Sequence, residues 1–210
     1  MHEKVTPKLK GKQHFDEKYV PMKLKKDHYD LNCIDAVTKY ITAHLFVGKR
    51  TKKKCVEFLS QIKNTCSEQI LETYYCERKK PKEERKLITF VCDKFWNYKA
   101  AWSKLFFRTT TLVAGVPIAC KKYGLEHNNN PIERYNGKIK DRIKVMRGGF
   151  NSFEGAEAFL NLRRVVHNFV NPHQGLNGKT PAETAGINLR LGRNKLLELI
   201  KRVRRNNISR

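Results

Sequence analysis

The sequence lacks any long apolar segment. No uninterrupted apolar run in its 210 residues approaches the roughly 20 residues that a helix needs to cross a bilayer. The first fifteen residues, MHEKVTPKLKGKQHF, also lack the apolar centre of a secretory signal peptide. We therefore expect a cytoplasmic protein that works inside the cell and has no membrane partner.

The sequence also lacks paired cysteines. None of its six cysteines belongs to a CxxC motif, which argues against a structural zinc site. In a reducing compartment most of them are expected to be small core residues. They are Cys33, Cys55, Cys66, Cys76, Cys92 and Cys120.

Acidic residues are scarce. The chain has 20 Asp and Glu against 44 Lys and Arg, which gives a net charge of +24. A compact protein with this charge repels itself unless a polyanion is near, so nucleic acid is the expected partner and an anionic membrane surface the lesser alternative. The basic residues are spread along the whole chain, which favours a binding surface over a detachable basic tail.

What is present predicts a folded α/β domain, because 40% of the residues are hydrophobic and 10% aromatic. Alternation and helical spacing predict three antiparallel strands, then helix, strand, helix and strand, and finally helices. We expect a mixed five-stranded sheet flanked by helices. The expected strands are 14–24, 30–35, 39–46, 87–92 and 109–120. The first expected helix starts after Thr51, and the others are 97–107, 131–146, 152–168, 180–183 and 194–205.

Aspartates occur at two informative places in this pattern. Asp93 directly follows the apolar strand LITFVC, and the carboxyl ends of strands are where open α/β sheets bind ligands. It can equally begin the turn DKFWN. Asp16 lies inside the first strand, where aspartate is disfavoured, so it either points to solvent or has a partner that requires it. Asp35 is a rival candidate, but its place beside a turn is more typical of a turn residue.

Glu133 is the third acidic candidate, in NNNPIERYNGKIKDRIK (residues 128–144). One interpretation is local: Asn130 caps a helix, and Glu133 at the third helical position reaches back to the cap. The other is functional. By the helical period, Gly137, Lys140 and Lys144 lie within about 40° of Glu133, so one edge can offer a carboxylate to a metal and two ammonium groups to phosphates.

At this point the order of motifs resembles a known family, the DDE transposases of insertion sequences. Their catalytic core is RNase H-like and is shared with retroviral integrases. The likeness extends over roughly residues 14 to 186, and no single motif in it is very specific. It is carried by FDEKYVPMK, CIDAVTKYITAHLF, TFVCDKFWNYKAAW, HNNNPIERYNGKIKDRIKVMRGGFNSFEGAEAFLNL and the closing NPHQGLNGKTPAE.

The resemblance implies that Asp16, Asp93 and Glu133 are the catalytic acids and metal ligands. Two Mg²⁺ ions, for which Mn²⁺ can substitute, would clamp an in-line displacement at phosphorus during strand cleavage and strand transfer. The implied partners are the DNA of transposon ends and of the target, bound by a homodimer or larger oligomer in the nucleoid of a prokaryotic host. The candidate DNA contacts near the active site are Lys138, Lys140, Arg142, Lys144 and Arg147.

Three features depart from the family pattern. Asp16 lies almost at the start of the chain, whereas relatives carry a DNA-binding helix-turn-helix before it. Asp93 and Glu133 are forty positions apart, a little more than usual, and Pro21 interrupts the first expected strand. The alternative function is therefore a truncated, inactive remnant that only binds DNA; RNA binding rests on charge alone. The expected organisation is a basic lead at 1–13, the catalytic core at 14–190 and a basic helical tail at 191–210.

Overall fold

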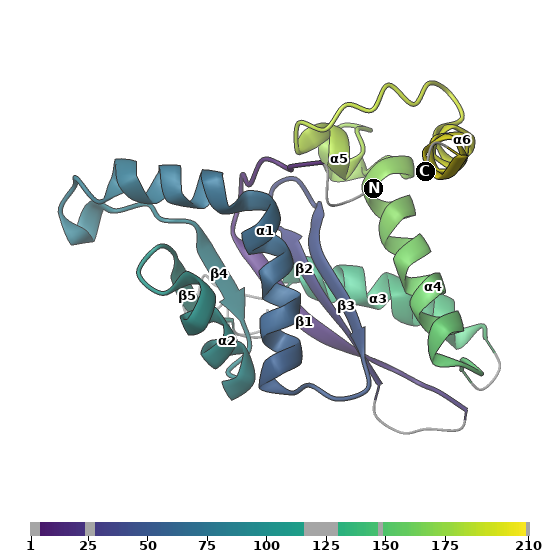
Figure 1. Ribbon diagram of the computed structural model, residues 1–210, viewed down its shortest axis with the longest axis horizontal. Coiled ribbons are helices and arrows are strands. Elements are labelled where there is room, and N and C mark those ends of the chain that lie inside the picture. Colours follow the sequence, from purple (N-terminus) through teal and green to yellow (C-terminus); the bar gives the residue numbers. More distant parts are fainter. Residues whose placement is uncertain (1–4, 24–27, 116–129, 147–148, 209–210) are drawn as a thin grey trace.

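The computed structural model describes residues 5–23, 28–115, 130–146 and 149–208. A five-stranded sheet with the order β3-β2-β1-β4-β5 forms its centre (Figure 1). The first three strands are antiparallel, and β4 and β5 continue the sheet parallel to β1. The mixed α/β sheet predicted from the sequence is confirmed. The strands are β1 Gln13–Val20, β2 His28–Asp35, β3 Ile41–Val47, β4 Thr89–Cys92 and β5 Thr111–Ala114.

The first strand is shorter than predicted because Pro21 ends it. Proline has no N–H to donate to a sheet, so strand β1 stops at Val20. The chain then pairs with a distant segment: the Phe150 N–H donates to the Pro21 carbonyl, and the Lys23 N–H donates to the Phe150 carbonyl. The fifth strand is also shorter than predicted, and residues 116–120 of that prediction lie outside the described part of the chain.

Helices cover both faces of the sheet. Helices α1 and α2 pack on one face through residues such as Phe58 and Phe106, and α3 and α4 pack on the other through Ile132 and Leu160. Figure 1 shows α1 in front of the sheet and α3 behind it. The helices are α1 Lys52–Glu77, α2 Trp96–Phe106, α3 Asn130–Lys144, α4 Phe153–Val165, α5 Pro181–Thr184 and α6 Lys195–Ile208.

Predicted caps start three of these helices. The Thr51 side chain accepts the Lys54 N–H, and the Ser152 side chain accepts the Gly155 N–H. Thr180 and Glu183 form the complete capping box that TPAE predicts. Helix α3 is described from Asn130 onward, where the described residues resume, so the predicted cap at its start stays a prediction.

The two terminal segments are attached to the domain. At the N-terminus, the Lys10 and Gly11 N–H groups donate to Asp35 Oδ2, both at 2.9 Å. Asp35 also accepts the Val37 and Thr38 N–H groups, which confirms it as a turn residue. At the C-terminus, Leu199 of α6 is buried in a third cluster with Phe169, which lies in the π-helical turn Val166–Val170 after α4.

Candidate metal centre

The parallel pairing of β1 and β4 brings Asp16 and Asp93 together. Gln13 lies opposite Phe90 and His14 opposite Val91, and the same offset places Asp93 beside Asp16. Strand β4 ends one residue before Asp93, so this carboxylate lies at the carboxyl end of a buried strand. The Phe95 N–H donates to Asp93 Oδ1 at 3.0 Å, which turns the chain into α2. Asp93 is therefore both a turn residue and part of an acidic cluster.

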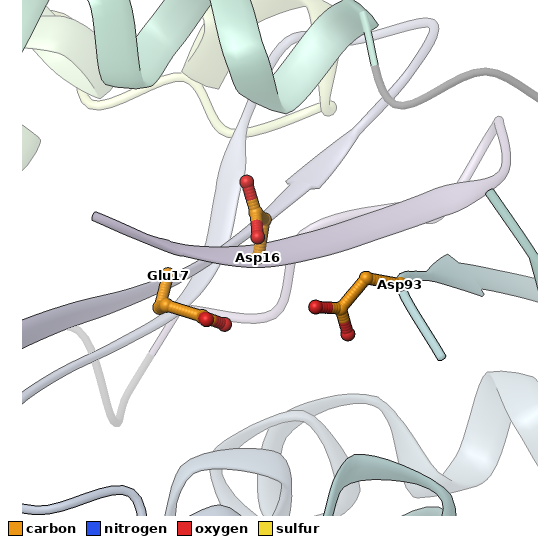
Figure 2. Close-up of side chains that lie close together, drawn as sticks. All are labelled: Asp16, Glu17 and Asp93. Carbon is orange, nitrogen blue, oxygen red and sulfur yellow. The ribbon is translucent and has the colours of Figure 1, made fainter. Parts of the chain in front are cut away.

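Glu17 joins this cluster, which the sequence did not indicate. Asp16, Glu17 and Asp93 each place one carboxylate oxygen within 4.8 Å of the others. Figure 2 shows Glu17 and Asp93 extending toward each other, with Asp16 directed to the opposite side of β1. All three carboxylates are partly buried. Three like charges this close need compensation by a cation.

Glu17 already has its compensation from the protein. Arg50 Nη1 donates to Glu17 Oε1, and the Tyr98 hydroxyl donates to Oε2 at 2.8 Å. The Arg50 guanidinium lies between the rings of Tyr29 and Phe95, 4.5 and 4.6 Å from their centroids. Through these hydrogen bonds Glu17 links β1 to α2, and through Arg50 it also reaches Phe95, two residues after Asp93.

Asp16 forms no such direct ion pair within the described residues. Burial, then the charges of Asp93 and Glu133, raise the pKa of Asp16 from 3.8 to about 6, against smaller opposing effects of Asn136 and Arg50. Asn136 Nδ2 donates to Asp16 Oδ2 at 3.4 Å, a long hydrogen bond. Asn136 follows Glu133 by three residues on α3, so this face of the helix is directed at Asp16. Glu133 is solvent-exposed and outside the three-residue cluster, but its charge acts on Asp16.

The side-chain oxygen atoms around Asp16 fit a divalent cation that prefers oxygen ligands. Besides the carboxylates, the side-chain oxygens of Asn32 and Asn136 are buried and have no hydrogen-bond partner in the described residues. Asn32 lies directly opposite Asp16 on β2 and so shares its face of the sheet. Carboxylate and amide oxygens are typical ligands of Mg²⁺ and Ca²⁺, and no cysteine thiol belongs to the set.

The predicted DNA contacts do not lie together. Lys140 is on the Glu133 side of α3. Burial and then the charge of Lys140 lower the pKa of Lys18 on β1, while Asp16 opposes this effect. The two ammonium groups are therefore neighbours beside Asp16. Lys138 lies about 140° around the helix from Glu133 and lines a separate cavity. Lys144 is 3.8 Å from Asp141, and Arg142 is exposed. Arg147 lies outside the described residues.

Comparison with known proteins identifies the fold. No family model and no curated protein sequence matches the chain. A chain of the simian T-cell lymphotropic virus intasome, solved with the PP2A regulatory subunit B56 gamma, is 10% identical with a TM-score of 0.54; the match covers 88% of this chain and 59% of that chain. The HTLV-2 integrase catalytic core domain in complex with magnesium, in its dimeric form, is 13% identical with a TM-score of 0.50, over 86% and 98% of the two chains.

The fold is that of an integrase catalytic core. The RNase H-like architecture implied by the sequence resemblance is therefore confirmed at the level of the fold. In this integrase-like fold Asp16 and Asp93 are adjacent, and Glu133 approaches from α3. Sequence reasoning missed Glu17, Arg50, Tyr98 and Asn136. Only Asn136 had a usable signal, because it follows Glu133 at helical spacing.

Proposed function

We propose that the chain is a metal-dependent polynucleotidyl transferase that acts on DNA, of the DDE transposase type found in insertion sequences. It would cleave a DNA strand at the transposon end and join the freed 3′-hydroxyl to target DNA. The observation that carries this proposal is the placing of Asp16 and Asp93 side by side on neighbouring strands of an integrase-like sheet, with Glu133 on α3 close enough for its charge to act on Asp16. The magnesium in the HTLV-2 core supports the same ligand chemistry.

Each acid has a distinct part in this proposal. Asp16 and Asp93 would hold the metal between β1 and β4, and Glu133 would complete the ligand set from α3. Two bound Mg²⁺ ions supply positive charge to the attacking and leaving oxygens of phosphoryl transfer. Asn136 holds the Asp16 carboxylate in place, and Glu17 with Arg50 fixes the Asp93 loop. No side-chain nucleophile is required.

The basic surface would hold the DNA. Lys18 and Lys140 lie beside Asp16, where they can contact phosphates next to the scissile one. The HTLV-2 integrase core was solved in a dimeric form, which supports a homodimer or larger oligomer as the working form. A DNA-associated location in the cell follows from this proposal.

A second candidate function is DNA binding without catalysis. The specific observation in its favour is that Glu133 is exposed and stands apart from the tight cluster of Asp16, Glu17 and Asp93. In such a protein the charge of +24 would still hold DNA, but the third ligand would not form a working centre with the two aspartates.

Nicking of supercoiled plasmid in Mg²⁺ or Mn²⁺ separates the two candidates. We expect the unmodified protein to nick the plasmid. Asp93→Asn and Glu133→Gln should lower the nicking rate more than about a hundredfold, since replacing a residue that only hydrogen-bonds to a metal ligand already lowers activity about 10- to 100-fold. Asp141→Asn, an exposed acid on the same helix, is the matched control and should nick normally. Tight DNA binding without nicking in any version would establish the second candidate.

A further inference from the structure

A small cavity lies away from the acidic cluster, where α3, the end of α4 and the segment before α5 meet. Its volume is about 210 Å³, and its lining includes Tyr135 and Lys138 of α3, Arg163 and His167 near the end of α4, and His173. This is below the range of roughly 300 to 1,000 Å³ of pockets for drug-sized molecules. A small group of atoms fits here better than a base with its sugar.

The lining is basic. Lys138, Arg163 and His173 contribute to it, and none of its residues is acidic. Within the described part of the chain, neither Lys138 nor Arg163 has a carboxylate partner. The cavity therefore collects positive charge without an anion from the protein to balance it, which attracts an anionic ligand.

The lining also contains buried donors that lack acceptors. The Tyr135 hydroxyl and Arg163 Nε are both buried without a hydrogen-bond partner among the described residues. Both residues line the cavity, and a buried donor without a partner is costly, so an anion that draws either donor into contact would be favoured. His173 adds a third donor: its Nδ1 accepts the Gly175 N–H, so the proton of the neutral ring is on Nε2.

A tetrahedral oxyanion satisfies this arrangement, because it brings several acceptor oxygens and negative charge in a small volume. We infer that this cavity binds a backbone phosphate of DNA that is not the scissile one. The inference rests on the proposed function for its DNA partner. Lys138 connects the cavity to the candidate metal centre, because it lies on the same helix as Glu133 but on the side turned away from it. The site would hold a second stretch of the DNA against the end of α4.

The test is the salt dependence of duplex binding, measured by fluorescence anisotropy. Lys138→Ala and Arg163→Ala should each weaken binding about tenfold, the loss expected for one charge-assisted hydrogen bond. Each should also make the slope of log K against log salt shallower by about one. The charge-matched control is Lys54→Ala on α1, across the sheet, where Lys54 pairs with Glu57 at 2.8 Å. Lys54→Ala should change both the duplex affinity and the salt slope by less than the two cavity variants do.

Tyr135→Phe is the sharpest variant, because it removes one oxygen and leaves the ring packing. Without DNA it should not lower the melting temperature, since the hydroxyl has no partner within the described residues, yet it should weaken DNA binding severalfold. Nicking is scored in the unmodified protein, whereas duplex binding is scored in the cavity variants, and this separates the inference from the proposed function. A protein that binds DNA through this cavity but never nicks would refute only the proposed function.

Three results would overturn the inference. The first is that Lys138→Ala and Arg163→Ala bind duplex no differently from Lys54→Ala. The second is that inorganic phosphate raises the melting temperature of the unmodified protein but not of Arg163→Ala, and that both proteins bind DNA equally well. That result would assign the cavity to free phosphate. The third is the absence of DNA binding by the unmodified protein, which would refute the proposed function as well.

Discussion

At the scale of single residues, Asp16 carries the largest electrostatic conflict of the candidate centre. Its carboxylate is partly buried, is close to the charges of Asp93 and Glu133, and accepts a hydrogen bond from Asn136. Without a metal, the ionised form is therefore less stable in the folded protein than in the unfolded chain. This local cost is typical of sites arranged to receive a ligand.

Replacing this carboxylate should stabilise the metal-free protein. The pKa of Asp16 is 3.8 without its surroundings and about 6 in the fold, so the folded state binds the extra proton between these values. The destabilising effect is absent at pH below 3.8, grows as pH rises and is complete above 6. At neutral pH, Asp16→Asn should raise the free energy of unfolding by about 1 to 3 kcal/mol in urea titrations.

Magnesium supplies the control for that measurement. Mg²⁺ should raise the melting temperature of the unmodified protein, because a ligand that binds only the folded state stabilises it, and should have little effect on Asp16→Asn. If Asp16→Asn instead lowers stability at neutral pH as much as at acidic pH, Asp16 is an ordinary structural residue and the conflict described above does not exist.

Glu17 should behave as a positioning residue and not as a metal ligand, since Arg50 and Tyr98 already occupy its oxygens. Glu17→Gln should reduce nicking about tenfold and lower stability by about 1 to 2 kcal/mol, because a charge-assisted contact to Arg50 is lost. The concentration of Mn²⁺ that gives half-maximal nicking should stay unchanged. An increase in that concentration comparable to the one in Asp93→Asn would make Glu17 a ligand.

At the scale of elements, local sequence signals located most of the strands and helices. Thr51, Ser152 and Thr180 cap helices as predicted, because a cap is a contact between residues close in sequence. Proline at position 21 ended β1 for an equally local reason. The partners of Glu17 were not predictable in this way, since Arg50 and Tyr98 are 33 and 81 positions distant and their approach depends on the whole fold.

The C-terminal helix was predicted from the sequence and is present as α6, and it allows a test. Its Leu199, which is 3% exposed, is buried against the cluster around Phe169, a contact that the local sequence does not specify. Leu199→Ala should lower the free energy of unfolding by about 2 to 3 kcal/mol in chemical denaturation, as expected for a truncated core leucine. Leu197→Ala, at a 44% exposed position of the same helix, should change it by less than about 0.5 kcal/mol. Equal, small effects would mean that α6 does not pack on the domain in solution.

At the scale of the whole molecule, the net charge predicts a nucleic-acid partner but does not predict the path that DNA would take. Four of the five predicted basic contacts lie on α3, and the fold places Lys140 on the flank of Asp16 and Lys138 on the opposite flank with the cavity. Such a division depends on how α3 lies on the sheet, which no local pattern of lysines specifies. The same holds for the adjacency of Asp16 and Asp93. The sequence indicates that each aspartate lies in or after a strand, but it does not indicate the register in which β1 pairs with β4.

The charge of +24 leads to a prediction for the assembled complex. If about eight phosphates are neutralised, log K for duplex DNA should fall with log salt at a slope near −7. DNA should also raise the melting temperature, because it relieves repulsion among the basic residues in the folded state. Anisotropy titrations at several salt concentrations, with and without Mg²⁺, measure the slope. A slope near −2 would mean that most of the basic residues face solvent in the complex, and binding would then depend on a few contacts beside Asp16.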